Sequence, residues 1–404
     1  MKAKVPSSYF FSSAWFLLIA CILITCNSSM KGDEKFAGKL IVFTPDPIHP
    51  KTPTPFDSIV QSVEVVALQT TDNSLISSIS KLRVIGDYIV ILDASQRVLF
   101  FFDSAGNFVK RIDPGEDPES PREIRDFTFD EHNNIFILGT YELVKFDPNG
   151  KYIERKKLSF DYEFIGSANP TQVAYLKGDF YLWAGSLGRE TLGKYNEYAL
   201  YKIDNNYQVT GKYFVLKNSI LEVHRFQEFA DSIIMTPTAL NDTLYKITRQ
   251  AVTARYWVDF KDKAVSKHPD VQKEAESESA LKYRLLTSTD LCMSIRFFIA
   301  TPQYIYFQYG CGSSGYEHFL NTATSHQVTG RYYDALTGEM PMLFPAGPAG
   351  NQMVFFTEAG NLSQKVEYYD KSGWPVYLLP NKDLLKSIRA DANPVLSFIT
   401  FKDF

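Results

Sequence analysis

The sequence predicts an all-β protein, a six-bladed β-propeller with short helical insertions. Short runs of β-branched and aromatic residues alternate with turn residues, and aromatic residues make up 15% of the chain, a composition that favours strands. One unit also recurs, because Val98–Ile112 and Glu142–Arg155 both read apolar run, Phe-Asp, two residues, Gly, one residue, aromatic residue. The two copies are about 44 residues apart, a spacing typical of a four-stranded propeller blade.

The first 25 residues are typical of a secretory signal. Lys2 and Lys4 precede an apolar run at 14–24, and Cys26 follows the run. The run is shorter than the roughly 20 apolar residues that a membrane-spanning helix needs. The segment resembles a bacterial lipobox, with Cys26 at the position of the lipidated cysteine. We expect residues 1–25 to be a lipoprotein signal peptide and Cys26 to be lipidated; the alternative is an uncleaved anchor with an incidental cysteine.

Residues 26–56 are expected to form a flexible tether, because they are rich in Pro, Lys, Asp and Thr. Within this segment, residues 31–35 resemble the acidic tag that directs some lipoproteins to the outer face of the outer membrane. The predicted location is therefore the outer membrane, on its periplasmic or its surface-exposed side. Contact with the membrane is expected through the lipid anchor alone.

Residues 57–404 are expected to form the propeller. In blades one and two an apolar strand precedes each copy of the repeat unit, at Tyr88–Leu92 and Asn134–Leu138. The Asp of the unit is expected to cap the turn after its strand, and the Gly to supply left-handed backbone there. Weaker copies predict three further blades, with strands at 180–183 and 198–204, at 231–235 and 241–247, and around two cysteines up to residue 338.

The sixth blade requires both ends of the propeller. Two of its strands are expected at 352–356 and 394–401, and the N-terminal Val60–Leu68 is expected to add the outer strand. Pairing the first and last strands closes the ring and leaves no open sheet edge. Two insertions are predicted to be helical, at 269–280 and at 381–389, the second with Asn381 as its N-cap.

Cys292 and Cys311 are the only cysteines in the predicted propeller. They flank a turn at Thr301–Pro302, and they are equally distant from it. A tight turn would therefore place them opposite each other on a hairpin. In an exported protein they either form a cross-strand disulfide or remain two buried thiols, and the sequence leaves both open.

The chain resembles a family of six-bladed β-propeller lipoproteins from gut-type Gram-negative anaerobes, which are similar in layout to NHL-repeat propellers. The resemblance covers about 57–404 and depends on the Phe-Asp-x-x-Gly-x-aromatic turns, on Asn241–Ile247 and on the ending Asn393–Leu396. The family often has a Gly-Pro-Gly-rich loop between blades one and two, and Asp113–Pro121 departs from that pattern. The family has no general assigned activity, so the resemblance implies a fold and a location.

No catalytic motif is found in the sequence. Gly-x-Ser-x-Gly is absent, phosphate and calcium loops are absent, and the six histidines show no zinc-binding spacing. We therefore predict no catalytic residue, no metal site and no cofactor. A metal site built from residues of separate blades would escape this search, because such residues lie far apart in the chain.

Propellers bind ligands where their innermost strands begin, at the mouth of the central channel. The polar and aromatic residues expected at that place are Arg122, Arg125, Asp126, Gln172, His224, Arg225, Tyr283 and Arg284. Several arginines together with an aromatic residue could hold an anionic or sugar-like ligand. Alternatively, each arginine pairs with a neighbouring acid, such as Glu123 or Asp126, on a solvated rim.

These observations predict an outer-membrane-anchored propeller that binds a ligand or a protein and performs no catalysis. Its expected partner is a glycan, a peptide or an envelope protein, and the chain is expected to be a monomer. A further hypothesis is a scaffold for an envelope complex, which differs from such a binding module only in the size of its partner. The net charge is −4 and no block of like charge is present, so nucleic acid is not expected as a partner. The alternative is a metal-dependent propeller enzyme of the lactonase, lyase or glycan hydrolase type.

Overall fold

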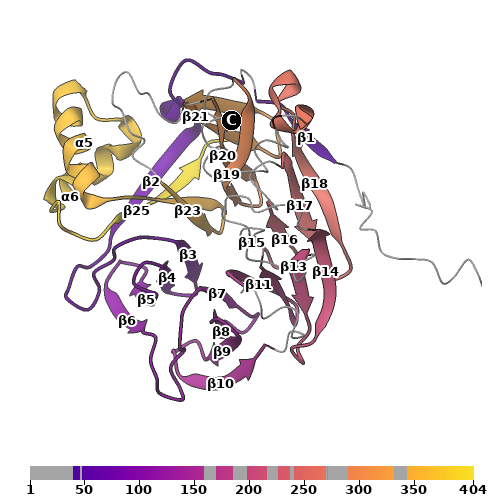
Figure 1. Ribbon diagram of the computed structural model, residues 1–404. Coiled ribbons are helices and arrows are strands. Elements are labelled where there is room, and N and C mark those ends of the chain that lie inside the picture. The colour runs from indigo at the N-terminus through magenta and orange to yellow at the C-terminus, as the bar shows by residue number, and fades with distance from the viewer. Residues whose placement is uncertain are drawn as a thin grey trace, which may run out of the picture. The chain divides into compact units, whose positions relative to one another are not determined.

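A computed structural model describes residues 40–45, 48–158, 170–184, 198–215, 226–236, 241–269, 271, 290–312, 314–331 and 344–404. The described residues form six antiparallel sheets, each of four propeller strands. The sheets are arranged in a ring, and the inner strand of each sheet faces the centre (Figure 1). The predicted six-bladed β-propeller is therefore confirmed.

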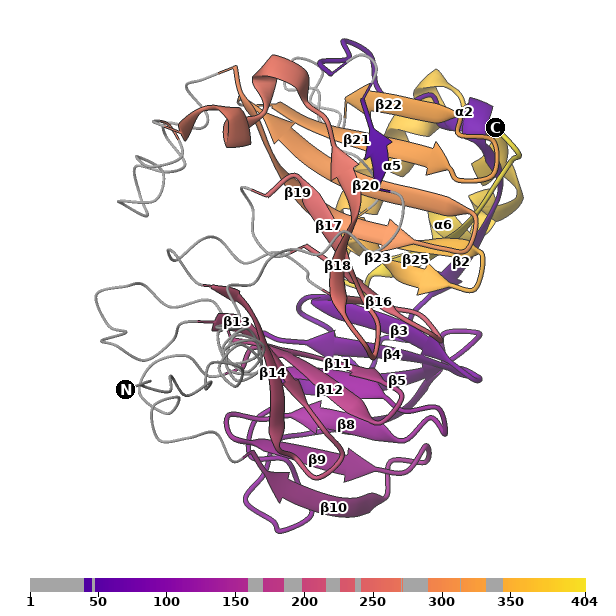
Figure 2. The same cartoon turned by 90° about the vertical axis from the view of Figure 1, so that its right-hand side faces the viewer.

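The first three blades follow one another along the chain, each from its inner to its outer strand. Blade one contains β3 (Lys81–Ile85), β4 (Tyr88–Asp93), β5 (Val98–Asp103) and β6 (Phe108–Ile112). Blade two contains β7 (Asp126–Phe129), β8 (Ile135–Leu138), β9 (Glu142–Phe146) and β10 (Tyr152–Lys157). Blade three contains β11 (Gln172–Leu176), β12 (Asp179–Trp183), β13 (Tyr198–Ile203) and β14 (Val209–Val215). After a turn of 90°, β8, β9 and β10 are seen side by side at one end of the body (Figure 2).

Blades four and five continue this order, and blade six closes the ring. Blade four contains β15 (Phe226–Glu228), β16 (Ile233–Met235), β17 (Thr243–Ile247) and β18 (Val252–Val258). Blade five contains β19 (Cys292–Ala300), β20 (Tyr304–Cys311), β21 (Ser314–Asn321) and β22 (Gln327–Arg331). Blade six contains β23 (Phe344–Ala349), β24 (Gln352–Thr357), β25 (Val395–Phe401) and, at its outer edge, the N-terminal β2 (Val60–Ala67). The predicted pairing of the first and last propeller strands is confirmed by the register from Val60↔Phe401 to Ala67↔Val395.

The apolar strands are buried on both faces, which explains why they lack a simple alternation of polar and apolar residues. In β4, Ile89 and Ile91 pack into the core shared with blade six. The intervening Val90 and Leu92 pack into the core shared with blade two. Because successive side chains of a strand point to opposite faces, each blade supplies half of two neighbouring cores.

The repeated Asp-x-x-Gly turn has the geometry that the sequence predicts. The Oδ1 atom of Asp103 accepts hydrogen bonds from the backbone N–H groups of Ala105 and Asn107, at 3.0 and 2.8 Å. Gly106 has a φ of +86° and Gly150 a φ of +78°, values that an L-residue adopts at a cost. Blade three builds the same turn with Tyr207 at a φ of +64°, which is why its sequence signal is weaker.

The expected tether differs from the structure over its second half. β1 (Ile41–Phe43) pairs in parallel with β18 and adds a fifth strand to blade four. Phe43 is buried in the core between blades four and five, and Pro53 forms a bridge with Arg331 at the edge of blade five. Residues 40–45 and 48–56 therefore lie along the propeller, where apolar side chains and edge hydrogen bonds hold them, and the prediction of a flexible tether is wrong for them. Residues 26–39, with Cys26, lie outside the described residues.

The helices are short and lie mainly between β24 and β25. α5 (Ala359–Ser372), η4 (Val376–Asn381) and α6 (Lys382–Ser387) form this insertion, and the other helices among the described residues are α2 (Phe56–Ile59), η2 (Lys261–Lys263) and η3 (Val265–Lys267). The helix predicted at 381–389 is present as α6, but the side chain of Asn381 does not cap it. Its Nδ2 atom instead donates to the carbonyl of Val63, at 2.8 Å, and holds the insertion on blade six. The helix predicted at 269–280 lies almost entirely outside the described residues.

In the part of the chain that the structure describes, no helix combines the length and the apolar character needed to cross a membrane.

Candidate functional site at the channel mouth

A cavity of about 410 Å³ lies at the centre of the ring, and all six blades contribute to its wall. Four inner strands contribute their first residues, and these are Lys81 of β3, Asp126 of β7, Gln172 of β11 and Phe226 of β15. Blades five and six complete the wall with Phe297–Ile299 and Pro345–Pro348. The cavity therefore occupies the mouth of the central channel, where a propeller can gather side chains from segments far apart in the sequence.

Three of the residues expected at the mouth line this cavity: Arg125, Asp126 and Gln172. Arg122 does not line it, because its side chain is exposed and the residue is held by a backbone N–H donated to Glu142 Oε1 at 3.3 Å. The other four expected residues, His224, Arg225, Tyr283 and Arg284, lie outside the described residues.

One acidic side chain on the rim is shared by two arginines. Arg125 Nε donates to Glu123 Oε2 at 3.0 Å, and Arg97 Nη1 lies 3.6 Å from Glu123 Oε1. Burial acts to raise the pKa of Glu123, but hydrogen bonds from Thr140 and Arg125 and the nearby positive charges hold the pKa below its ordinary value. Glu123 is therefore ionised at neutral pH, and the pairing that the sequence analysis gave as an alternative is present for Arg125.

A second charged pair lies deeper in the channel. Lys81 Nζ donates to Asp126 Oδ1 at 2.9 Å and to the carbonyl of Phe127 at 2.6 Å. The Oδ2 atom of Asp126 accepts a hydrogen bond from the backbone N–H of Val173 at 2.7 Å. This carboxylate thus connects blades one, two and three.

A third layer of the channel repeats the arrangement. Arg83 Nη2 lies 2.9 Å from Glu228 Oε2, so blade one is joined to blade four. Thr128 donates to Glu228 Oε1 at 2.9 Å and accepts from the backbone N–H of Tyr175 at 3.1 Å. Lys81, Arg83 and Glu228 were not predicted from the sequence; the available signal was the presence of two cations at alternate positions of the strand at 81–85.

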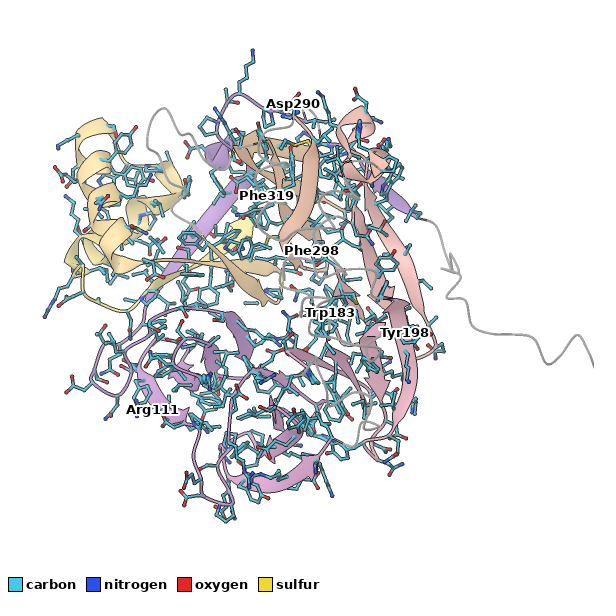
Figure 3. All side chains as sticks on the ribbon, in the orientation of Figure 1. Arg111, Trp183, Tyr198, Asp290, Phe298 and Phe319 are labelled. Carbon is cyan, nitrogen blue, oxygen red and sulfur yellow. A yellow bond between two sulfur atoms is a disulfide. The ribbon has the colours of Figure 1, made fainter. Side chains whose placement is uncertain are left out.

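Blades five and six present a mainly apolar wall opposite these charges. The register of β19 with β20 shifts between Arg296 and Ile299, and within this bulge Phe297 has a φ of +48°. Such bulges change the direction in which a strand aims its side chains. Phe298 lies near the centre of the ring (Figure 3). Pro345 and Pro348 extend the apolar wall on β23.

The described lining carries more positive than negative charge. Lys81, Arg83, Arg97 and Arg125 are cationic, whereas Glu123 and Asp126 are acidic, and Glu228 adds one further acid behind Arg83. Arg97 is 62% exposed, and its ion pair among the described residues is with a carboxylate that Arg125 already bonds. The site can therefore accept an anionic group beside an apolar surface. Both acidic side chains of the described lining are paired, Glu123 with Arg125 and Asp126 with Lys81.

The ring and its cavity define the chain as a six-bladed propeller with a polar channel mouth. The chain belongs to the family described as a domain of unknown function, DUF4934, whose model matches residues 41–400. The match begins at β1, which agrees with the docking of that strand on blade four. No curated protein matches the chain.

Two solved structures match the chain over most of its length. A protein of Bacteroides fragilis described as exported is 15% identical, with a TM-score of 0.71, and the match covers 90% of this chain and 100% of that one. A member of the DUF4221 family from Bacteroides vulgatus is 10% identical, with a TM-score of 0.49, over 85% of this chain and 99% of that one. At 15% identity, the likeness to the Bacteroides fragilis protein shows the propeller fold alone.

Proposed function

We propose that this chain is an exported, lipid-anchored binding module that holds an anionic group of a glycan or peptide at its channel mouth. The observation that carries the proposal is the carboxylate of Glu123, which two guanidinium groups, those of Arg97 and Arg125, share within the described part of the rim. Guanidinium groups bind carboxylates and phosphates through paired hydrogen bonds. The apolar wall of blades five and six would receive the uncharged face of the same ligand.

The proposed anchor is Cys26, for which the lipobox-like sequence at 14–26 is the support. The 14 residues between Cys26 and β1 can span at most about 50 Å when fully extended. The propeller would therefore stay close to the membrane surface. The variant Cys26→Ser should appear in the soluble fraction and lack the mass of the acyl chains, and membrane retention of this variant would contradict the anchor.

Binding can be tested by calorimetry on the purified protein with matched acidic and neutral probes. Suitable probes are oligomers of galacturonate and of galactose, together with a short peptide that carries a free or an amidated C-terminus. We expect an acidic probe to bind at least about tenfold more tightly than its neutral counterpart, since a hydrogen bond to a charged group contributes roughly 1.5–3 kcal/mol.

The variants Arg97→Gln and Arg125→Gln should each remove most of this preference. The matched control is Arg111→Gln, because Arg111 pairs with Asp113 in blade one, away from the cavity (Figure 3). Equal binding of acidic and neutral probes, or loss of binding in the Arg111 variant alone, would contradict the proposal.

A further inference from the structure

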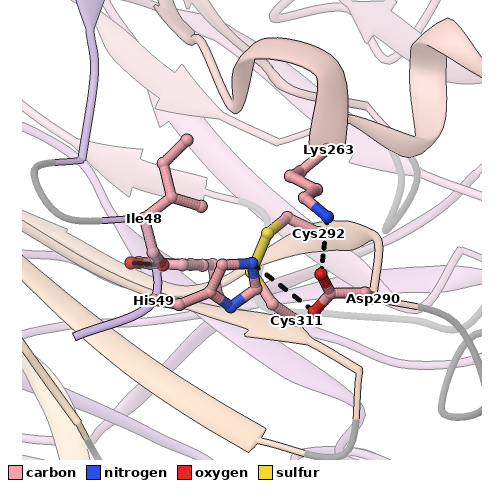
Figure 4. Close-up of a disulfide and its surroundings, with 7 residues drawn as sticks. Ile48, His49, Lys263, Asp290, Cys292 and Cys311 are labelled. Atoms are coloured by element: carbon pink, nitrogen blue, oxygen red, sulfur yellow. Dashed lines mark hydrogen bonds and ion pairs between the residues drawn. A yellow bond between two sulfur atoms is a disulfide. The ribbon is translucent and has the colours of Figure 1, made fainter. Parts of the chain in front are cut away.

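A second cluster of chemically reactive side chains lies in blade five, around a disulfide. Cys292, the first residue of β19, is bonded to Cys311, the last residue of β20. His49, from the N-terminal segment, lies beside this disulfide, and Asp290 approaches from the chain just before β19 (Figure 4). The cluster is separate from the channel-mouth cavity, whose wall contains none of these residues.

The geometry of the cluster is that of a metal-binding set. The Sγ atoms of Cys292 and Cys311 and a ring nitrogen of His49 all lie within 4.8 Å of one another. Asp290 Oδ1 lies 3.7 Å from His49 Nε2. That nitrogen is buried and makes no hydrogen bond among the described residues, although a histidine nitrogen normally finds a partner. Two sulfurs and one imidazole are ligands that suit tetrahedral Zn²⁺, and Asp290, which is not one of this group of three, lies beside His49 where it could supply a fourth.

We propose that reduction of the Cys292–Cys311 disulfide opens a Zn²⁺ site formed by the two thiolates and His49 Nε2, with Asp290 as the fourth ligand. A dithiol supplies two electrons and two protons, which break the S–S bond and give two thiols, while the dithiol closes to its own disulfide. Zn²⁺ then replaces the two thiol protons, which pass to the solvent. In the oxidised chain there is no thiolate, so the site is closed.

The ligands are held by contacts that do not depend on the disulfide. β19 and β20 remain paired through the rest of their register. The N-terminal segment is fixed beside them because Tyr309 donates its hydroxyl hydrogen to the carbonyl of Ile48 at 2.9 Å. The ring of His49 also packs edge-on against Tyr316, with 5.8 Å between the ring centroids. Reduction should therefore leave His49 in place to meet the thiolates.

Asp290 connects the cluster to solvent. Both cysteines are buried, whereas the Asp290 side chain is 70% exposed. Asp290 is bonded to Lys263 at 2.5 Å, and this ammonium competes with an incoming cation for the carboxylate. Removing the lysine charge should consequently tighten metal binding.

The test uses the chain with Cys21→Ser and Cys26→Ser, so that the disulfide pair supplies all of its thiols. The protein is studied oxidised, and again after reduction with dithiothreitol and removal of the reductant without air. Co²⁺ serves as the spectroscopic probe, and Zn²⁺ is titrated against it. We expect no binding to the oxidised chain. The reduced chain should bind one Co²⁺ with a sulfur-to-cobalt absorption band, and Zn²⁺ should displace it.

Substitutions then assign the ligands. His49→Gln should weaken Zn²⁺ binding at least about tenfold. The matched control is His268→Gln, at the residue that follows η3, and this variant should bind Zn²⁺ as the parent does. Lys263→Met should bind more tightly. Thermal unfolding of the reduced chain checks that it is folded, and Zn²⁺ should raise its midpoint more than in the His49 variant. A reduced chain that is unfolded, that binds no metal, or that binds equally well with His49→Gln would overturn the proposal.

Discussion

The channel and the outer part of blade five both bury a carboxylate, but they surround it differently. In the channel, Asp126 bonds to the ammonium of Lys81 and to the backbone N–H of Val173. In blade five, Glu317 is bonded only by hydroxyl groups, those of Thr54 and, at 3.4 Å, Tyr306. Glu317 thus lacks a charged partner among the contacts that the structure describes.

The difference follows from the position of each strand in its sheet. Asp126 lies on an inner strand, and an inner strand has one unpaired edge, which faces the central channel. The side chains of Asp126 and Thr128 take up two N–H groups of the free edge of β11. Glu317 lies on β21, which is paired on both sides with β20 and β22, so the surrounding N–H groups are already bonded.

The consequence is a difference in titration. Burial raises the pKa of Glu317 to about 7, although hydrogen bonds from Thr54 and Tyr306 act to lower it. On the opposite face of the same strand, burial lowers the pKa of His318 to about 3, so this histidine is neutral and offers no compensating charge. The channel is therefore built on fixed charges, and blade five on a carboxylate that changes its charge near neutral pH.

The largest effect is expected from removing the cation of the channel pair. Lys81→Met leaves Asp126 buried without its ammonium, and we expect a loss of about 3 kcal/mol in the free energy of unfolding, measured in urea. Adding Asp126→Asn to this variant should restore part of the loss. The control is Lys371→Met, whose exposed pair with Glu367 should contribute nothing measurable. A loss below about 1 kcal/mol would show that the pair is not desolvated.

An intermediate effect is expected from Glu317→Gln, and it should depend on pH. Because the folded pKa of about 7 lies above the ordinary 4.5, the folded chain binds more protons than the unfolded chain between these values. The contribution of Glu317 is therefore fully present below about pH 4.5 and is lost as the pH rises through about 7.

Glu317→Gln should remove this slope and make the protein roughly 1–3 kcal/mol more stable than the parent at pH 8. Unfolding in urea at a series of pH values measures it. Glu367→Gln, on the exposed face of α5, should keep the slope of the parent. An unchanged slope in the Glu317 variant would assign the pH dependence to another group.

The same contrast explains what could be predicted from the sequence. The blades were predictable because Asp103 and Gly106 perform local tasks, a turn cap and a left-handed residue, that only a few residue types can perform. β1 was not predictable, because the short apolar run at 40–43 gives no periodic signal and is held by the distant β18. α5 was also missed, since its first turn has no acidic residue and its N-cap, Glu358, makes no capping bond.

At the channel mouth, too, the sequence could place individual residues but not their partners. Arg125 and Asp126 could be placed at the mouth because they begin an inner strand. Their partners in other blades could not be predicted, because Lys81 lies 45 residues from Asp126 and only closure of the ring brings them together. His49 is still farther in sequence from the disulfide that it contacts, so the spacing of the histidines gave no sign of this cluster.

The smallest effect is expected from Thr54→Val, which keeps the shape of the side chain and removes one hydrogen bond to Glu317. Thr54 packs directly over Gly330, which has no Cβ atom to displace it, so a valine of the same shape should still dock on the edge of blade five. At pH 8 we expect a loss of about 1 kcal/mol, the usual contribution of one hydrogen bond. The pKa of Glu317 should rise further, because the ionised form loses a donor.

The pH series therefore separates the two possible roles of Thr54. If the hydroxyl stabilises the carboxylate, the loss is greatest above pH 7 and diminishes in acid, where Glu317 is protonated. If Thr54 acts only through packing, valine should match the parent at every pH. Thr210→Val, in the exposed part of β14, provides the control, because its bond to the carbonyl of Lys202 is long, at 3.5 Å. A uniform loss at all pH values would show that Thr54 holds the N-terminal segment without affecting the charge of Glu317.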